Sequence, residues 1–376
     1  MARSLGRNGL LAGVFGALAA VASAGDLVIH EWGTITTVHA ADGQPQGGLN
    51  NIDESDVLPS FVHRYEPEVT RFDPKLKLGK LPNIPGRPDV TMRLETPVIY
   101  FHPSAGRKFD QPIDVLVQFR GGVINEFYPR AAPAIRLDRE RVFSKRAAGV
   151  FEEWTGEVLN KYVVSSLNWR GVTLHDTVVA PLTNDPVWLA PREPQSASVF
   201  VAEAGEGERY LFYRGVAHLD ALLQTRLTSG HVRLSAPELF TWAQSPAVTL
   251  RNVWLAEVHA DGAVAFRAHG PLSFKTTEPG RDLARLKRFG KGDDAAENLE
   301  ALRASMKAAL IEDGLFADEA QAMLNTWKHS YFEKPGLRVF YVVPREWTDY
   351  FLPLEFSVPA SVNRVIIGRI DLLPAR

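Results

Sequence analysis

Short runs of β-branched, aromatic and aliphatic residues recur along most of this chain, and glycine, proline or aspartate separates them. Segments of this kind predict β-strands. We expect strands at 27–39, 94–102, 115–119, 123–128, 166–174, 198–203, 209–214, 248–259, 263–268, 337–343, 350–358 and 364–373. Glycine-containing turns predict three hairpins between neighbouring strands, at Gly121-Gly122, Gly205-Glu206-Gly207 and Asp261-Gly262.

Late in the chain, the spacing of the apolar residues changes from that of a strand to that of a helix. Between 294 and 312, apolar residues recur at spacings of three and four, and a second helix is expected from about 318 to 328. Asp293 or Asp294 can cap the first helix, and Gly314 suits the left-handed position past its end. This pattern predicts an α+β protein that is mainly β, with an antiparallel β-sandwich-like core and a late αα-hairpin insertion at about 281–329.

The first residues predict export from the cytoplasm. A basic segment is followed by an apolar run and by Ala22-Ser23-Ala24, the arrangement of a secretory signal peptide covering 1–24. Cleavage near Ala24 would leave 25–376 as a single β-rich domain without a transmembrane segment, in the periplasm or outside the cell. Within it, 40–89 is rich in proline and glycine and predicts a long irregular loop.

The amino-acid composition excludes several classes of ligand and active site. With 42 Lys+Arg against 44 Asp+Glu, the chain lacks the basic excess of a nucleic-acid-binding protein. The absence of cysteine excludes a thiol nucleophile, disulfides and thiolate metal sites. Any divalent metal would therefore be held by histidine and carboxylate groups. Since no Walker or dinucleotide-binding motif occurs, we expect no nucleotide cofactor.

The stretch 27–39 carries the strongest functional signal. Both of its alternating faces are largely apolar, so His30 or Glu31 must point toward a buried surface. Gly33 indicates either a bulge or a close backbone approach. The pair could act as acid/base or metal-ligand groups, or Glu31 could form a structural pair with an arginine. A zinc-protease HExxH motif is excluded because Thr34 replaces the second histidine.

Glu126 is a second carboxylate that the strand pattern places among apolar residues. If Gly121-Gly122 forms a two-residue turn, Glu126 faces Val117 in an apolar patch near Tyr128, which would raise its pKa. The alternative is an arginine partner. The candidate catalytic residues are thus His30, Glu31 and Glu126. The candidate metal ligands are His30, Glu31, His39 and His63, and His102 is a further histidine that a His/carboxylate cluster could include.

The stretches 30–34, 94–101, 126–129 and 365–373 resemble those of a group of secreted bacterial proteins with an N-terminal His-Glu-Trp-Gly-Thr stretch. The resemblance covers most of the mature chain. No activity is known for that group, so the resemblance implies no particular reaction.

The sequence is compatible with three functions. The first is an envelope or extracellular hydrolase with a His/carboxylate site. The second is a glycan- or peptide-binding module that presents Trp154, Trp169 or Trp188 from loops. The third is a structural envelope protein that uses the αα-hairpin or an edge strand for contact.

Overall fold

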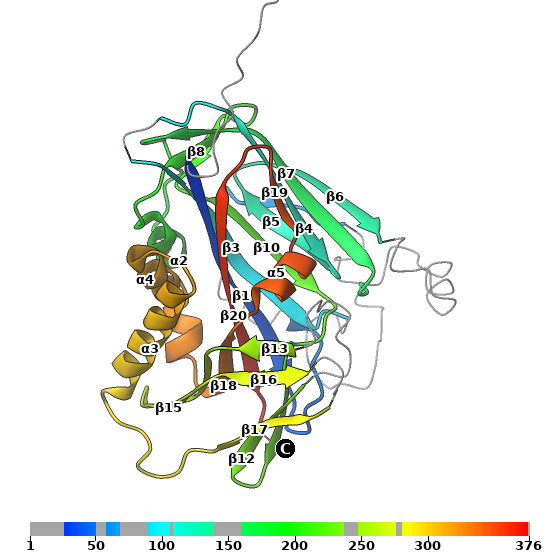
Figure 1. Ribbon diagram of the computed structural model, residues 1–376, viewed down its shortest axis with the longest axis vertical. Helices are drawn as coiled ribbons and strands as arrows, with labels where there is room; N and C mark the ends of the chain where they lie inside the picture. Colours follow the sequence, from blue (N-terminus) through cyan, green and yellow to red (C-terminus); the bar gives the residue numbers. More distant parts are fainter. Residues whose placement is uncertain are drawn as a thin grey trace, which may run out of the picture.

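A single large sheet organises the molecule (Figure 1). The computed structural model describes residues 26–49, 58–67, 89–105, 108–138, 159–236, 247–275 and 280–374. The sheet has 15 strands. Its main path runs through β15 (Val264–His269), β14 (Val253–Val258), β18 (Gly336–Val342), β20 (Ser361–Leu372), β1 (Leu27–His39), β3 (Met92–Pro103), β10 (Leu211–Ala217), β5 (Gly122–Tyr128), β7 (Val163–His175), β4 (Ile113–Arg120) and β19 (Leu354–Phe356).

Shorter elements complete the structure. Four strands join the sheet beside this path: β2 (His63–Arg64), β6 (Ala132–Leu137), β8 (Ser198–Val201) and β9 (Glu206–Glu208). Two small sheets contain β11 (Gln224–Thr228), β12 (His231–Ser235) and β17 (Asp282–Lys287), and β13 (Ala247–Leu250) with β16 (Leu272–Lys275). The helices are α2 (Pro186–Leu189), the 3-10 turn η3 (Ala190–Arg192), α3 (Asn298–Glu312), α4 (Ala317–Thr326), the π-helix η4 (His329–Glu333) and α5 (Arg345–Phe351).

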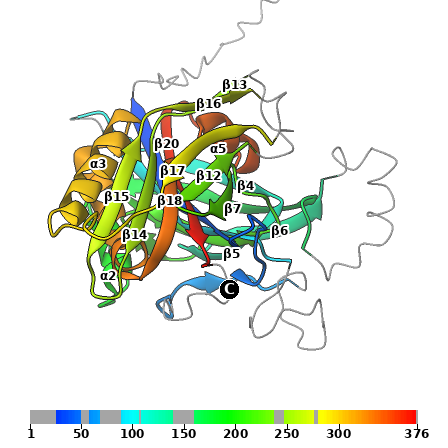
Figure 2. The same cartoon turned by 90° about the horizontal axis from the view of Figure 1, so that it is seen from below.

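Strand β1 is buried on both faces. It runs parallel to β20 and antiparallel to β3. Leu27 and Ile29 belong to one core, which Trp347 and Phe351 of α5 help to fill. Trp32 belongs to a second core, built largely from α3 and α4. Figure 2 shows α3 and α5 on either side of β20. The charged residues of β1 therefore have no solvent-facing side, as the sequence pattern indicated.

The predicted fold class is confirmed. The protein is mostly β, with several sheets in a sandwich-like arrangement and helices late in the chain. The predicted αα-hairpin corresponds to α3 and α4, and Gly314 has a φ of 109°. The predicted cap is wrong, because Glu297 occupies the N-cap of α3. Asp293 instead accepts a hydrogen bond from the Gly290 N–H.

Tertiary structure contradicts the strands predicted at 248–259 and 350–358 and the hairpin predicted at Gly121-Gly122. The segment 248–259 is divided between β13, which pairs with β16 in a small sheet, and β14, which belongs to the large sheet. The Gly121-Gly122 turn does not join a hairpin, because β7 lies between β4 and β5 in the sheet. The segment 350–358 is not one strand: α5 ends at Phe351 and only the short β19 follows. Apolar Trp347 and Phe351 lie four residues apart on the buried face of that helix.

Of the other two predicted hairpins, the one at Asp261-Gly262 is confirmed, and the one that joins 198–203 to 209–214 is wrong. Asp261-Gly262 connects β14 to β15. At the Gly205 turn, β8 pairs with the short β9, whereas β10 pairs with β3 and β5. The signal peptide prediction and much of the predicted loop 40–89 lie outside the described residues. In the part of the chain that the structure describes, no helix has the length and apolarity needed to span a membrane.

Candidate functional site

His30 and Glu31 leave β1 on opposite faces, because successive side chains of a strand alternate. The register with β20 sets His30 opposite Asn363 and Glu31 opposite Arg364. The two residues therefore do not form one acid/base pair. They belong to two separate sites, one on each side of the sheet.

On the α4 side, His30 and His102 of β3 converge on Glu319 of α4. His30 Nδ1 lies 2.6 Å from Glu319 Oε2, and His102 Nε2 lies 2.9 Å from Glu319 Oε1. One ligand-type atom from each residue lies within 4.8 Å of the other two. Among the described residues, this is the one group of three or more histidine and acidic side chains with metal-ligand spacing. We call these three residues the His–Glu–His cluster.

Helix α4 fixes the carboxylate of the cluster. Glu319 stands in the first turn and also accepts the backbone N–H of Phe316 at 2.8 Å, as a capping residue does. Burial alone would raise the pKa of Glu319, but hydrogen bonds from His102 and His30 lower it below its usual value. The carboxylate is thus ionised and accepts three hydrogen bonds.

Asn363 determines where His30 carries its proton. The Asn363 amide nitrogen lies 3.1 Å from His30 Nε2 and 3.4 Å from the Gly314 carbonyl oxygen, and it donates to both. His30 therefore holds its proton on Nδ1 and donates it to Glu319. A hydrogen bond to the second imidazole nitrogen is also the usual way of orienting a metal-binding histidine.

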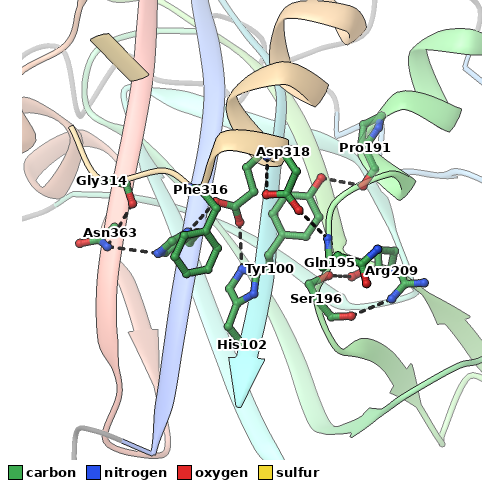
Figure 3. A network of polar contacts seen from close by, with 12 residues as sticks. Tyr100, His102, Pro191, Gln195, Ser196, Arg209, Gly314, Phe316, Asp318 and Asn363 are labelled. Atoms are coloured by element: carbon green, nitrogen blue, oxygen red, sulfur yellow. Dashed lines mark hydrogen bonds and ion pairs between the residues drawn. The ribbon is translucent and has the colours of Figure 1, made fainter. Parts of the chain in front are cut away.

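The Phe316 ring covers the cluster (Figure 3). Its centroid lies 4.5 Å from that of His30 and 4.9 Å from that of His102. His30 and Glu319 are buried, the His102 side chain is 11% exposed, and Phe316 is 46% exposed. The cluster is therefore largely shielded from solvent, and the Phe316 ring packs against both of its imidazoles.

Glu31 occupies a separate, charge-balanced site. Its carboxylate accepts from the Tyr213 hydroxyl and from Arg364 Nε, each at 2.5 Å, and Arg364 Nη1 also donates to Asp349 of α5. Burial and the charge of Glu31 raise the pKa of Tyr213. Burial would lower the pKa of the Arg364 guanidinium, but the charge of Glu31 raises it. This arrangement matches the structural glutamate–arginine pair that was the alternative for Glu31.

Glu126 is paired rather than isolated. It forms ion pairs with Arg214 of β10 and, at 3.5 Å, with Arg64 of β2. The apolar patch expected opposite Val117 is absent around it, because β7 separates β4 from β5. The arginine alternative therefore describes Glu126. In the part of the chain that the structure describes, the ion-pair partners of Glu126 are these two arginines, and Glu31 is paired with Arg364 instead.

The other two predicted metal ligands lie elsewhere. His39 Nδ1 lies 2.7 Å from Thr225 Oγ1, and burial lowers the pKa of His39 to about 4. His63 Nε2 lies 2.9 Å from both carboxylate oxygens of Glu206. His63 is held there because β2 pairs with β5. Of the predicted set, only His30 joins the His–Glu–His cluster.

Sequence reasoning missed Glu319. The residue belongs to a helix that pattern alone identifies, and a signal was present in that helix. Glu319 precedes Met323 by four residues, which places a carboxylate on the buried face of α4. A carboxylate on an apolar helix face needs a partner, but its spacing does not reveal which strand provides one.

A cavity of about 420 Å³ lies beside the cluster and is large enough for a small molecule. Its wall contains Asn363, which bonds His30, and Arg364, which bonds Glu31. Asn363 and Arg364 thus reach this cavity, whereas the three cluster residues and Glu31 are not among its lining residues. The rest of its lining comes from Ala247, Val248, Thr249, Arg251, Glu312, Asp313, Val342, Val343, Pro344, Arg345 and Glu346.

The tryptophans proposed as binding platforms are not exposed. Trp169 and Trp188 are buried. The indole N–H of Trp169 donates to the Pro129 carbonyl, and that of Trp188 donates to Glu208. Trp154 lies outside the described residues.

Comparison with models of known protein families and with curated proteins gave no match to this chain. The functional argument therefore rests on the geometry of the His–Glu–His cluster and the adjoining cavity.

Proposed function

We propose that the protein is an envelope or extracellular hydrolase whose reaction takes place at the His–Glu–His cluster. One observation carries this proposal: an ionised, buried Glu319 is held between His30 and His102. Perturbed ionisable groups cluster at functional sites, and two imidazoles with a carboxylate can move the protons of a hydrolytic reaction.

The adjoining cavity supports a small polar substrate. Its volume of about 420 Å³ lies in the range of small-molecule sites. Arginine and acidic side chains both line it, including Arg251, Arg345 and Glu312. Asn363 lines this cavity and bonds His30, so a molecule bound there would be connected to the cluster through the Asn363 side chain.

Export is part of the same proposal. Residues 1–24 have the basic segment, apolar run and small-residue site of a signal peptide, so the enzyme would act in the periplasm or outside the cell. The intact mass of protein recovered from an envelope or culture fraction tests this point. A mass that begins at Gly25 supports export, and a full-length mass from the cytoplasm contradicts it.

Glu319→Gln tests the enzymatic proposal, because glutamine keeps the size of the side chain and removes its charge. The purified protein is assayed against chromogenic esters, phosphoesters, glycosides and peptides. We expect hydrolysis of one substrate class, reduced by about a hundredfold or more in Glu319→Gln. Glu206→Gln, at the separate His63–Glu206 pair, is the matched control and should retain activity. Equal hydrolysis by Glu319→Gln and the native protein would refute the proposal.

A further inference from the structure

We propose that the His–Glu–His cluster is a binding site for one divalent transition metal ion of the zinc class, with His30 Nδ1, His102 Nε2 and the Glu319 carboxylate as its protein ligands. This inference rests on the proposed function for its catalytic meaning. The binding of the ion can be tested without any substrate.

Charge balance is the first argument. Among the described residues, the ion-pair partners of Glu319 are His30 and His102 alone. The cluster therefore places a carboxylate in a buried position without an arginine or lysine among these partners. A buried charge is costly unless it is compensated. Glu31, on the other face of the same strand, has Arg364 for this purpose. A divalent cation would compensate Glu319 in the same way.

The donor set is the second argument. Two imidazole nitrogens and one carboxylate suit zinc and neighbouring transition metals. Three protein ligands leave a position for water, which is the arrangement of catalytic rather than structural sites. The chain has no cysteine, so a thiolate site cannot compete for the ion.

Geometry is the third argument. In a tetrahedral site, metal–ligand bonds of roughly 2.0–2.2 Å place neighbouring ligand atoms roughly 3.4 Å apart. The present nitrogen–oxygen contacts are 2.6 and 2.9 Å, so Glu319 must retreat by less than about 1 Å to admit the ion. The surroundings already orient two ligands, since Asn363 bonds His30 and the Phe316 N–H bonds Glu319.

Binding of the ion displaces one proton from each imidazole nitrogen that becomes a ligand, and each proton can move to the other nitrogen of its ring. When the ion takes Nδ1 of a neutral His30, the proton moves to Nε2, and the Asn363 amide turns so that its oxygen accepts it. The proton of a neutral His102 moves likewise from Nε2 to Nδ1. A water bound to the ion would then have a lowered pKa and could attack a substrate. This supplies the activated water that the proposed hydrolase needs.

Isothermal titration of chelator-stripped protein with Zn²⁺ tests the inference. We expect about one ion per chain. Glu319→Gln and, at the more exposed ligand, His102→Gln should each weaken binding more than about a hundredfold, and Asn363→Ala should weaken it about 10–100-fold. Glu206→Gln is the control and should bind as the native protein does. Circular dichroism establishes that each variant is folded.

Two results would overturn the metal site: no binding by the folded native protein, or unchanged affinity in both Glu319→Gln and His102→Gln. Failure of this inference is distinguishable from failure of the proposed function. If stripped protein hydrolyses its substrate at the full rate, the catalytic role of the ion is refuted and the hydrolase stands, whereas the titration alone decides whether the ion binds. If Zn²⁺ binds as expected but no substrate is hydrolysed, the metal site stands and the hydrolase is refuted.

Discussion

Glu319 Oε2 lies 2.6 Å from His30 Nδ1, and 289 positions of the chain separate the two residues. The contact forms because α4 packs its buried face against β1 and β3, where His30 and His102 leave the same side of the sheet. Asn363 enters from β20, the parallel neighbour of β1. The cluster is therefore a product of the tertiary fold, and each of its contacts can be changed separately.

Phe316→Ala should open the cluster. The Phe316 ring lies over both imidazoles, whereas its backbone N–H holds Glu319 and is kept in the variant. We expect a chelator to remove bound Zn²⁺ faster from Phe316→Ala than from the native protein, with little change in affinity. Phe316→Leu keeps an apolar cover and serves as the control. Equal release rates in all three proteins would show that Phe316 does not control access.

Glu31→Gln should destabilise the fold by about 3–5 kcal/mol, because it removes the buried counter-charge of the Arg364 guanidinium and leaves it paired with the half-exposed Asp349. Denaturant unfolding measures this loss. The control is Arg251→Met at the exposed Arg251–Asp313 pair, where the change should stay within about 1 kcal/mol. A similar, small change in both variants would contradict the structural importance of the Glu31–Arg364 pair.

His39 should make stability depend on pH. Its pKa is about 4 in the folded protein and 6.5 when unperturbed, so the unfolded chain binds more protons between these values. Stability should therefore fall as the pH is lowered from 6.5 toward 4, by roughly 3 kcal/mol from this residue. His39→Gln should show a correspondingly smaller fall in the free energy of unfolding. The same pH slope in both proteins would exclude His39 as the cause.

Gly33→Ala tests the close approach within β1. A Cβ at this position would lie 2.9 Å from the Pro97 Cα, a backbone atom of β3, beside the register shift between Trp32 and Thr34. We expect a loss of about 1–3 kcal/mol in unfolding free energy. Gly270→Ala meets open space and should change stability by no more than about 0.5 kcal/mol. Equal effects at the two glycines would argue against the steric explanation.

The local sequence pattern predicted where strands and helices lie better than it predicted which strands pair with one another. Strand β1 matches its predicted span because it is rich in β-branched and aliphatic residues and is buried along nearly its whole length. The Gly33 prediction is also confirmed, since the register shifts there and β3 approaches closely. The hairpin at Gly121 was wrong because a glycine turn permits a reversal but does not select the neighbouring strand. Pairing is decided by contacts far apart in the chain.

The same limit applies to the candidate site. Sequence analysis found His30 because a histidine stood in an apolar strand. It joined His30 to Glu31, its neighbour in the chain, although strand alternation sends the two to opposite faces. Glu319 was missed because only the docking of α4 brings it to β1. Burial of an ionisable residue was visible in the pattern, and the identity of its partner was not.

Anomalous diffraction at the zinc edge, from crystals of the Zn²⁺-loaded protein, tests the central claim most directly. We predict one strong peak within roughly 2.2 Å of His30 Nδ1, His102 Nε2 and a Glu319 carboxylate oxygen, and its loss in Glu319→Gln. A difference map without a peak between these three residues, or with its main peak at His39 or His63, would contradict the claim.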